Sequence, residues 1–217
     1  MKVVIALLTF RRTQYAVATI KAMRRHFKCD NYAWYVADGG SNAEHMQAIA
    51  SALTGEPLLG HHSILESSGA MQNRTVREVL KATDILFFLE DDWVLNRELD
   101  VRPYLTLLRD TPELGMVRFG YLGVGSDCRI EGYNGDYYMR FLRSTQYAYA
   151  GGPSIRHRRF VEAYGMFLEN VTAGQVEVDY DGRLRMTTGP EIVFPFAGAA
   201  GWGWFDHIGQ KRAGEFT

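Results

Sequence analysis

Three consecutive carboxylates follow the most apolar run of the chain and are its strongest candidate for chemistry. Glu90, Asp91 and Asp92 come directly after residues 85–89, five apolar residues typical of a buried strand. Carboxylates crowded at such a point repel one another and favour a neighbouring cation. A divalent metal ion held by one or two carboxylates keeps positions open for the oxygens of a diphosphate. The alternative is a solvated acidic turn, which the apolar run before the triplet makes the weaker interpretation.

Polar residues also follow two other predicted elements. Asp38 and Gly39 end an apolar run, where an Asp can accept hydrogen bonds from a base or ribose and a glycine lets a ligand approach the backbone. The alternative is an ordinary strand-to-helix turn in which Ser41 caps the next helix. Gly69 opens a helix with Asn73 in its first turn. This pattern can recognise a nucleotide or its phosphates, although a glycine before a helix is usually a turn.

The second half of the chain offers less specific candidates. Glu177 and Asp179 would share one face of an extended segment, where one could act as a general base or both could form an exposed polar edge. His207 offers an imidazole ligand for an ion such as Mn²⁺, although a single His is more often structural. Trp202 and Trp204 could stack on a sugar or pack in the core.

The first hundred residues alternate strand and helix patterns that would position these side chains. The predicted order is a strand at 3–8, a helical stripe at 16–27, a strand at 32–37, a helical stripe at 46–53, a short strand at 64–65, a helix over 70–82 and a strand at 85–89. This alternation predicts a mostly parallel sheet flanked by helices, with ligands beyond the carboxyl ends of its strands.

The remainder of the chain predicts a different arrangement. Short strands separated by Gly and Asp turns are expected at 116–122, 129–133, 137–142 and 192–194. We therefore expect an α/β fold with a Rossmann-like central sheet and a smaller mixed or antiparallel region. Since no repeat or linker divides the chain, residues 1–217 should form a single domain with halves at 1–93 and 94–217.

Composition narrows the class of protein. The 217 residues carry a formal net charge of −1 and are 47% hydrophobic, so the core is ample and no strong field attracts nucleic acid. Cys29 and Cys128 cannot build a disulfide scaffold. Neither a signal peptide nor a run of about 20 apolar residues is visible. We expect a cytoplasmic protein without a transmembrane segment and without a nucleic-acid partner.

Taken in order, the motifs resemble those of the GT-A glycosyltransferases, especially the family-2-like inverting enzymes. That family begins with a strand ending in a Thr-Tyr-Asn-Arg-like segment, here Thr-Phe-Arg-Arg at 9–12, followed by an Asp-Asp-Gly-Ser-like segment, here 38–41. A Gly before an Ala-Arg-Asn-like helix start matches Gly69 and 71–73. The Asp-x-Asp motif matches 90–92, with Glu90 in place of its first Asp. The resemblance covers about residues 3–93 as an ordered set and rests on three short motifs beyond them.

The resemblance implies transfer of a sugar from a UDP- or GDP-type donor to an acceptor hydroxyl, with inversion and with Mn²⁺ or Mg²⁺. The ion would be bound by Asp92 and His207. Glu177 or Asp179 would be the base, since Val178 replaces the Asp of the family's Glu-Asp motif. The acceptor region would include Gly151, Gly152, Trp202 and Trp204. Donor contacts would come from Thr9, Phe10, Arg11, Asp38, Gly39, Asn73, Glu90 and Asp91.

Two other functions remain compatible with the sequence. A sugar nucleotidylyltransferase would share the nucleotide-binding sheet, but the chain lacks a Gly-rich segment with Arg and Lys near its N-terminus. A non-catalytic nucleotide- or carbohydrate-binding domain would keep the fold with an altered site. The sequence leaves open the donor, the acceptor and whether the chain forms a homodimer.

Overall fold

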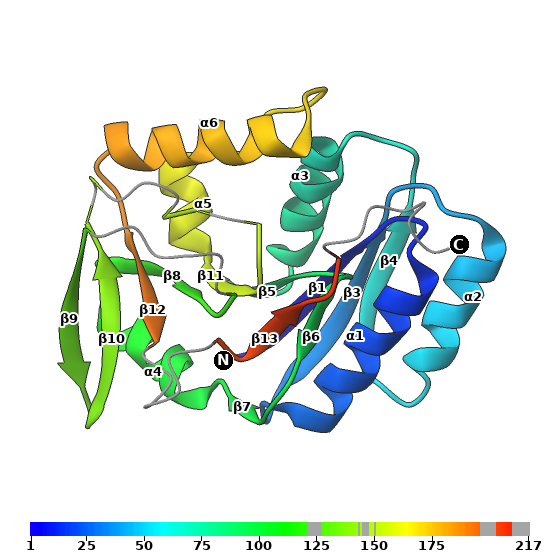
Figure 1. The fold of residues 1–217 in the computed structure, drawn as a ribbon, viewed down its shortest axis with the longest axis horizontal. Helices are drawn as coiled ribbons and strands as arrows, with labels where there is room; N and C mark the ends of the chain where they lie inside the picture. Colours follow the sequence, from blue (N-terminus) through cyan, green and yellow to red (C-terminus); the bar gives the residue numbers. More distant parts are fainter. Residues whose placement is uncertain (121–126, 143, 145–147, 150, 196–202, 210–217) are drawn as a thin grey trace.

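A nine-stranded mixed sheet runs through the molecule (Figure 1). The computed structural model describes residues 1–120, 127–142, 144, 148–149, 151–195 and 203–209. Across the sheet the strands are ordered β4 (Leu58–Ser63), β3 (Tyr32–Asp38), β1 (Val3–Thr9), β5 (Ile85–Glu90), β11 (Ser154–His157), β8 (Leu114–Arg118), β12 (Glu191–Pro195), β10 (Asp136–Phe141) and β9 (Cys128–Tyr133).

The first four strands of this order are parallel, as the sequence predicts. Their register places Thr9 beside Asp38 and Leu8 beside Glu90. The carboxyl ends of β3, β1 and β5 are therefore level. This alignment brings three of the predicted motifs to one edge of the sheet.

The other five strands form the mixed region. β11 is antiparallel to both β5 and β8, β8 is parallel to β12, and β10 is antiparallel to β12 and β9. Two short pairs lie outside the main sheet: β6 (Trp93–Leu95) with β13 (Phe205–His207), and β2 (Phe27–Lys28) with β7 (Leu99–Asp100). The β6–β13 pair carries His207 back to the residues that follow β5.

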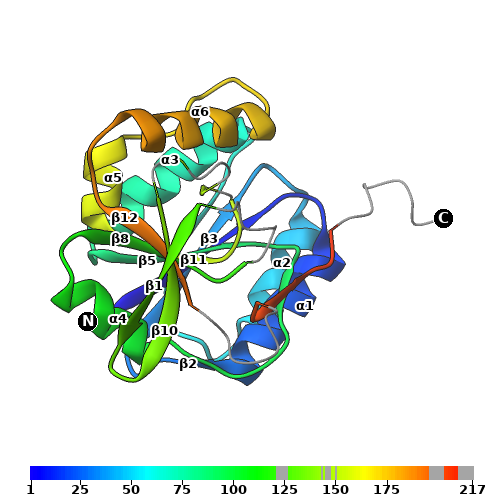
Figure 2. The same ribbon diagram turned by 60° about the vertical axis from the view of Figure 1, so that its left-hand side comes forward.

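Helices cover both faces of the sheet (Figure 2). α1 (Thr13–His26), α2 (Ala43–Ala52) and α4 (Arg102–Asp110) pack on one face, and α3 (Ser68–Val79), α5 (Arg158–Tyr164) and α6 (Ala173–Met186) pack on the other. Alternate residues of β1 divide between two cores, with Ile5 in the first and Ala6 in the second. Among the described residues, no helix has the length and apolar character needed to cross a bilayer.

Two of the predicted elements are wrong. The strand expected at 64–65 lies earlier, at β4, which is an edge strand whose Gly60, His61 and His62 give no apolar run. The segment at 177–181 is not extended but belongs to α6. A capping box between Thr172 and Gln175 starts this helix, and the inward side chains follow helical spacing.

Gly69 shows how closely α3 packs on the chain beside it. A Cβ at this position would lie 1.8 Å from the carbonyl oxygen of Leu168, whereas a Cβ at Gly182 in α6 would meet nothing within 4 Å. Only a residue without a side chain fits at Gly69, because the obstacle is backbone.

Gly69→Ala should therefore lower the free energy of unfolding by about 2 kcal/mol through overpacking. Gly182→Ala should raise it by up to about 1 kcal/mol, because Ala favours a helix. Urea unfolding of both variants checks the pair, and a Gly69→Ala protein as stable as the unchanged chain would contradict the packing described here.

Candidate functional site

The acidic triplet at the end of β5 points in three directions. Successive side chains of a strand alternate between its faces. Glu90 accordingly lies on the α6 side, against Gly151, and Asp91 lies on the α1 side, where it meets Arg12. Asp92 lies beside His207 of β13. The three adjacent side chains therefore lie in three different environments.

Asp91 joins the ends of β1 and β5 inside the protein. Its carboxylate accepts hydrogen bonds from the Thr9 hydroxyl at 2.8 Å and the Phe10 N–H at 3.2 Å. Its backbone carbonyl accepts from the Thr19 hydroxyl of α1 at 2.8 Å. Burial raises the pKa of Asp91 to about 6, against the opposing effect of Arg12. Asp91 is therefore an internal anchor.

Arg12 supplies a cation to the triplet from within the chain. Its guanidinium bridges the two aspartates, with Nη2 against Asp91 and Nη1 2.5 Å from Asp92 Oδ2. Although burial opposes it, the charges of Asp91 and Asp92 raise the pKa of Arg12 above its usual value. The predicted need for a neighbouring cation is thus met in part by a residue that precedes α1.

Asp92 and His207 are the residues that fit a metal ion. Asp92 Oδ1 is buried and has no hydrogen-bond partner among the described residues. Asp92 Oδ2 lies 3.2 Å from His207 Nε2, and the imidazole stacks on Trp93 with ring centroids 4.7 Å apart. A carboxylate and an imidazole suit Mn²⁺, and a carboxylate also suits Mg²⁺.

The described chain provides few ligands for such an ion. Within the described part of the chain, no group of three or more His, Cys, Asp or Glu side chains is placed to hold a metal ion. Mg²⁺ in particular is commonly bound through one or two carboxylates with substrate phosphates and water as the other ligands. Asp92 supplies one such carboxylate, and His207 lies beside it as a further ligand that Mn²⁺ could use.

The Asp38 carboxylate is hydrogen-bonded mainly within its own turn. Its carboxylate accepts from the Ser41 hydroxyl at 2.5 Å, the Ser41 N–H at 2.8 Å, the Gly40 N–H at 3.1 Å and the Ser63 hydroxyl at 2.5 Å. Burial opposes ionisation, but these bonds together lower the pKa of Asp38. Ser41 does not cap α2; Asn42 does, accepting from the His45 N–H. The geometry thus supports the interpretation of Asp38 as a turn residue.

His45 connects α2 with the end of β1. Its Nε2 lies 3.0 Å from Thr9 Oγ1 and its Nδ1 lies 2.8 Å from Thr13 Oγ1. Because Thr9 donates its proton to Asp91, a consistent network has Nε2–H donating to Thr9 and Nδ1 accepting from Thr13. Burial lowers the pKa of His45, with Asp38 opposing, which favours this neutral form.

Phe10 and Arg11 form an exposed surface beside these buried groups. The Phe10 side chain is 42% exposed, and the Arg11 guanidinium lies 4.7 Å from its ring centroid. A Cβ at Gly39 would approach the Phe10 ring to 3.1 Å, so the glycine lets the ring lie against the backbone. Arg11 has a φ of 57°, and its N–H donates to the Ser41 hydroxyl at 2.8 Å. An aromatic face and a cation are therefore both presented to solvent here.

Asn73 is engaged by the segment before α6. Its amide donates to the Phe167 carbonyl at 3.0 Å and to Glu169 Oε1 at 2.8 Å, and its carbonyl accepts from the Phe167 N–H at 2.8 Å. The same segment packs on Gly69. Both predicted residues of α3 therefore hold the fold together, and neither is brought to the Asp92–His207 pair by a contact in the structure.

Glu177 and Glu90 meet at Gly151. The Gly151 N–H donates to Glu177 Oε1 at 2.7 Å. A Cβ on Gly151 would lie 3.0 Å from Glu90 Oε1 and 3.2 Å from Glu177 Oε1. Burial, and then the charges of Asp92 and Glu177, raise the pKa of Glu90 to about 8. The glycine thus lets two carboxyl groups from different elements approach one backbone position.

Arg118, at the end of β8, is a buried cation on this side of the sheet. Burial lowers its pKa to about 10 while the charges of Glu177 and Asp181 raise it, so the guanidinium stays charged at neutral pH. It donates to the Ala148 carbonyl at 3.2 Å. Arg118 therefore balances the carboxylates of α6.

Asp179 lies on a different side of α6 from Glu177. Residues two apart on a helix point to nearly opposite sides, so the helical form of this segment separates Asp179 from Glu177. Asp179 instead pairs with Arg183 at 2.5 Å, one turn further along α6. The structure brings Glu177, and not Asp179, to Glu90.

Two further predicted residues, Gly152 and Trp204, lie around the β6–β13 pair. A Cβ at Gly152 would lie 3.2 Å from the Trp93 ring. Trp204 is half-buried and packs edge-on against Tyr104 and Phe119, as expected for a core aromatic. Trp202 lies outside the described residues.

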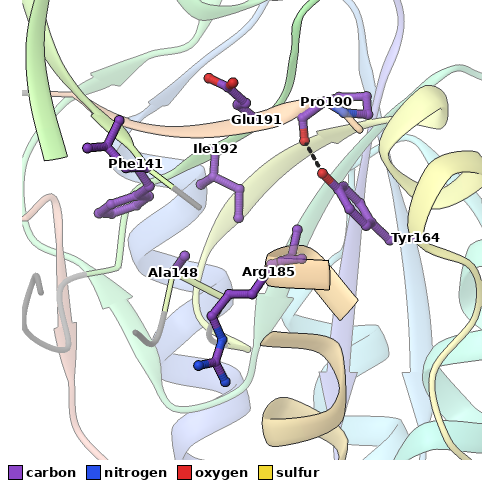
Figure 3. A pocket seen from close by; sticks show the side chains of 9 residues that line it. Phe141, Ala148, Tyr164, Arg185, Pro190, Glu191 and Ile192 are labelled. Carbon is purple, nitrogen blue, oxygen red and sulfur yellow. Dashed lines mark hydrogen bonds between the residues drawn. The ribbon is translucent and has the colours of Figure 1, made fainter. Parts of the chain in front are cut away.

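None of the predicted site residues lines the hollow shown in Figure 3. It has a volume of about 30 Å³, and Phe141, Glu191, Ile192 and Arg185 are among its lining residues. The Tyr164 hydroxyl donates to the Pro190 carbonyl at 2.9 Å beside it. A space that fits about one water molecule is too small for a nucleotide.

Sequence reasoning missed Arg12, His45 and Arg118 as residues of the site. Arg12 was visible only as the last residue of the segment 9–12. The signals for His45 and Arg118 are weak, because neither falls in a motif and both act through contacts distant in sequence.

Arg12→Ala should lower the free energy of unfolding by about 2–3 kcal/mol, because Asp91 and Asp92 would stay buried without their counter-ion. Arg102→Ala is the matched control. It breaks the exposed pair with Asp100 and should cost less than about 1 kcal/mol. Urea unfolding measures both, and equal losses would contradict the internal role given to Arg12.

Comparison with known proteins identifies the fold. Neither a protein-family model nor a curated protein matches the sequence. Among solved structures, S. aureus TarS 1-349 in complex with UDP-GlcNAc matches with a TM-score of 0.66 and 12% identity, over 98% of this chain and 62% of that one. The mannosyltransferase PcManGT from Pyrobaculum calidifontis, in complex with GDP-Man and Mn²⁺, matches with a TM-score of 0.60 and 15% identity, over 89% of this chain and 54% of that one.

Five of the matched solved chains are longer than this chain, which covers between 35% and 62% of the length of each. At identities of 11–15% the likeness establishes the fold alone. That fold is the α/β fold of the GT-A glycosyltransferases, as the sequence motifs predicted.

Proposed function

We propose that this protein transfers a sugar from a nucleoside-diphosphate donor to an acceptor hydroxyl in a metal-dependent reaction. The observation that carries the proposal is the Asp92–His207 pair beside the carboxyl ends of β1 and β5. The buried Oδ1 of Asp92 has no partner in the described part of the chain. It is supported by the matched structures, which hold UDP-GlcNAc in one case and GDP-Man with Mn²⁺ in another. A hydroxyl-bearing acceptor, a cytoplasmic location and a possible homodimer belong to the same proposal.

Donor binding would use the exposed residues at the end of β1. The exposed ring of Phe10 is available for stacking by the nucleobase of the donor, and the guanidinium of Arg11 is available to bind a phosphate oxygen. We assign Thr9, Asp38, Gly39 and Asp91 to the support of this surface, because most of their polar atoms already have partners within the chain. Asn73, which was predicted to contact the donor, is instead assigned to the packing of α3 on the segment before α6.

Asp92 and His207 would hold Mn²⁺ or Mg²⁺, and Glu90 stands at the first position of the family's acidic motif. The bound ion would neutralise charge on the leaving diphosphate. Arg12 holds Asp91 and Asp92 together at this point and so keeps Asp92 oriented toward His207.

Glu177 is the better candidate for the base. Its Oε1 is held by the Gly151 N–H, and its carboxylate borders Glu90 at the end of β5. In the proposed step the Glu177 carboxylate takes the proton of the acceptor hydroxyl as that oxygen bonds to the anomeric carbon. The bond from that carbon to the diphosphate oxygen breaks, and the nucleoside diphosphate leaves from the opposite face, with inversion.

Glu177→Gln should lower turnover at least about 100-fold while nucleotide binding is kept, because a general base contributes to the chemical step. Asp179→Asn is the matched control on the same helix and should lose only its pair with Arg183, worth about 0.5 kcal/mol. Release of nucleoside diphosphate from a panel of UDP- and GDP-sugars measures turnover.

Full turnover in the Glu177→Gln protein would remove Glu177 as the base. If no donor in the panel is turned over although nucleotide binds, the non-catalytic binding domain is the better account.

Asp92→Asn should weaken Mn²⁺-dependent binding of UDP or GDP by about 100-fold, since the variant replaces a charged ligand with a neutral one. Asp206→Asn is the control, because Asp206 is exposed and its carboxylate accepts from Asn96. Calorimetric titration with and without Mn²⁺ measures both, and unchanged affinity in Asp92→Asn would dismiss the assigned ion site.

A further inference from the structure

A second hollow, the hairpin cavity, lies between α4 and the turn that joins β9 to β10. Its volume is about 310 Å³, near the lower limit for small-molecule sites. β9 and β10 end the sheet on the side away from β4, and no lining residue belongs to β1, β3 or β5. The cavity is therefore separate from the site assigned to the donor. Its lining residues are Pro103, Tyr104, Thr106, Leu107, Tyr133, Asn134, Asp136 and Tyr138.

Tyrosines dominate the lining of this cavity. Tyr104 comes from α4, and Tyr133 and Tyr138 come from the two strands of the hairpin. The rings of Tyr133 and Tyr138 lie 6.4 Å apart and are inclined at 46°. Tyrosine rings offer broad apolar area with a polar group at one end. The lining is therefore suited to a ligand with both an apolar face and hydrogen-bonding groups.

Tyr138 carries the most specific indication of a ligand. The residue is only 4% exposed, and its hydroxyl has no hydrogen-bond partner among the described residues. A buried hydroxyl without a partner is destabilising, so such groups usually find one. Burial raises the pKa of Tyr138 to about 12, so the hydroxyl keeps its proton at neutral pH. Because the hydroxyl is covered in the unliganded protein, a ligand in the cavity reaches it through a small rotation of the Tyr138 ring, and the hydroxyl can then donate as well as accept.

The cavity is formed before any ligand binds. Asn134 and Gly135 both have positive φ, 50° and 88°, as a tight hairpin turn requires. The Tyr133 hydroxyl donates to Asp110 at the end of α4 at 2.7 Å. This bond joins the hairpin to the C-terminal end of the helix. A rigid site loses less conformational freedom on binding than a mobile one.

Asp136 and Asn134 add exposed polar groups to the tyrosines. Aromatic faces near a carboxylate also suit an organic cation. A quaternary ammonium group, however, has no hydrogen-bonding atom for the buried Tyr138 hydroxyl. A sugar ring has both hydroxyl groups for Tyr138 and Asp136 and an apolar C–H face for the tyrosine rings.

We propose that the hairpin cavity binds a pyranose unit of a carbohydrate, at a site separate from the one assigned to the donor. The inference rests on the hairpin cavity alone and stands whether or not the chain transfers sugars. If it does, the cavity would hold part of a glycan acceptor away from the reacting hydroxyl.

The test is NMR of the full chain with ¹³C-labelled tyrosine, titrated separately with maltotetraose, cellotetraose and chitotetraose. At least one of these probes should cause saturable shifts of the Tyr104, Tyr133 and Tyr138 ring signals. Tyr138→Phe should weaken that binding about fivefold, the effect of one neutral hydrogen bond. Its melting temperature should be unchanged or higher, because the hydroxyl that is removed bonds to no residue that the structure describes. Tyr137→Phe is the matched control, since Tyr137 is the exposed neighbour and does not line the cavity.

The proposal is overturned if no oligosaccharide causes saturable shifts at concentrations up to about 20 mM, because a dissociation constant above that value is too weak for specific recognition. It is also overturned if tetramethylammonium binds and the sugars do not, or if Tyr138→Phe binds the sugar as tightly as the unchanged protein. UDP titration in the presence of Mn²⁺ is run alongside. Loss of nucleotide binding with sugar binding kept would count against the proposed function and not against this cavity.

Discussion

The ion pairs of Arg12 with Asp91 and Asp92 are the interaction on which the site depends. Asp91 joins β1, β5 and α1 through Thr9, Phe10 and Thr19. A carboxylate so deeply buried needs a counter-ion, and Arg12 provides it while also contacting Asp92. The position of Asp92 beside His207 therefore follows from an anchor inside the protein.

The sheet divides the carboxyl groups between two tasks. The pleat of β5 directs Asp91 to the α1 face and Glu90 to the α6 face, where Glu177 approaches across Gly151. Asp92 and His207 stand at the end of the sheet between them. In the proposed reaction, binding of a nucleoside diphosphate and removal of a proton would take place on opposite sides of one strand end.

The first half of the fold could be predicted from the sequence, because buried parallel strands are continuous apolar runs and their ends are marked by polar residues. The edge strand β4 and the helix α6 could not. β4 has Gly60 and two histidines where an apolar run was expected, and the five residues from Glu177 onward alternate like a strand. Within the candidate site, Asp92, His207 and Glu177 were predicted from residue type and from the family resemblance, and their roles stay predictions. Arg12, His45 and Arg118 were not, because their roles arise from contacts between residues far apart in the chain.

The most direct test of an ion site at Asp92 and His207 is anomalous diffraction from a crystal containing Mn²⁺ and a nucleoside diphosphate. A Mn²⁺ peak is expected within about 2.1–2.3 Å of an Asp92 carboxylate oxygen and a His207 nitrogen. The diphosphate oxygens should complete the coordination of the ion, and the nucleobase should lie beside Phe10. A nucleotide bound without a peak at Asp92, or a peak at another group of residues, would contradict this ion site.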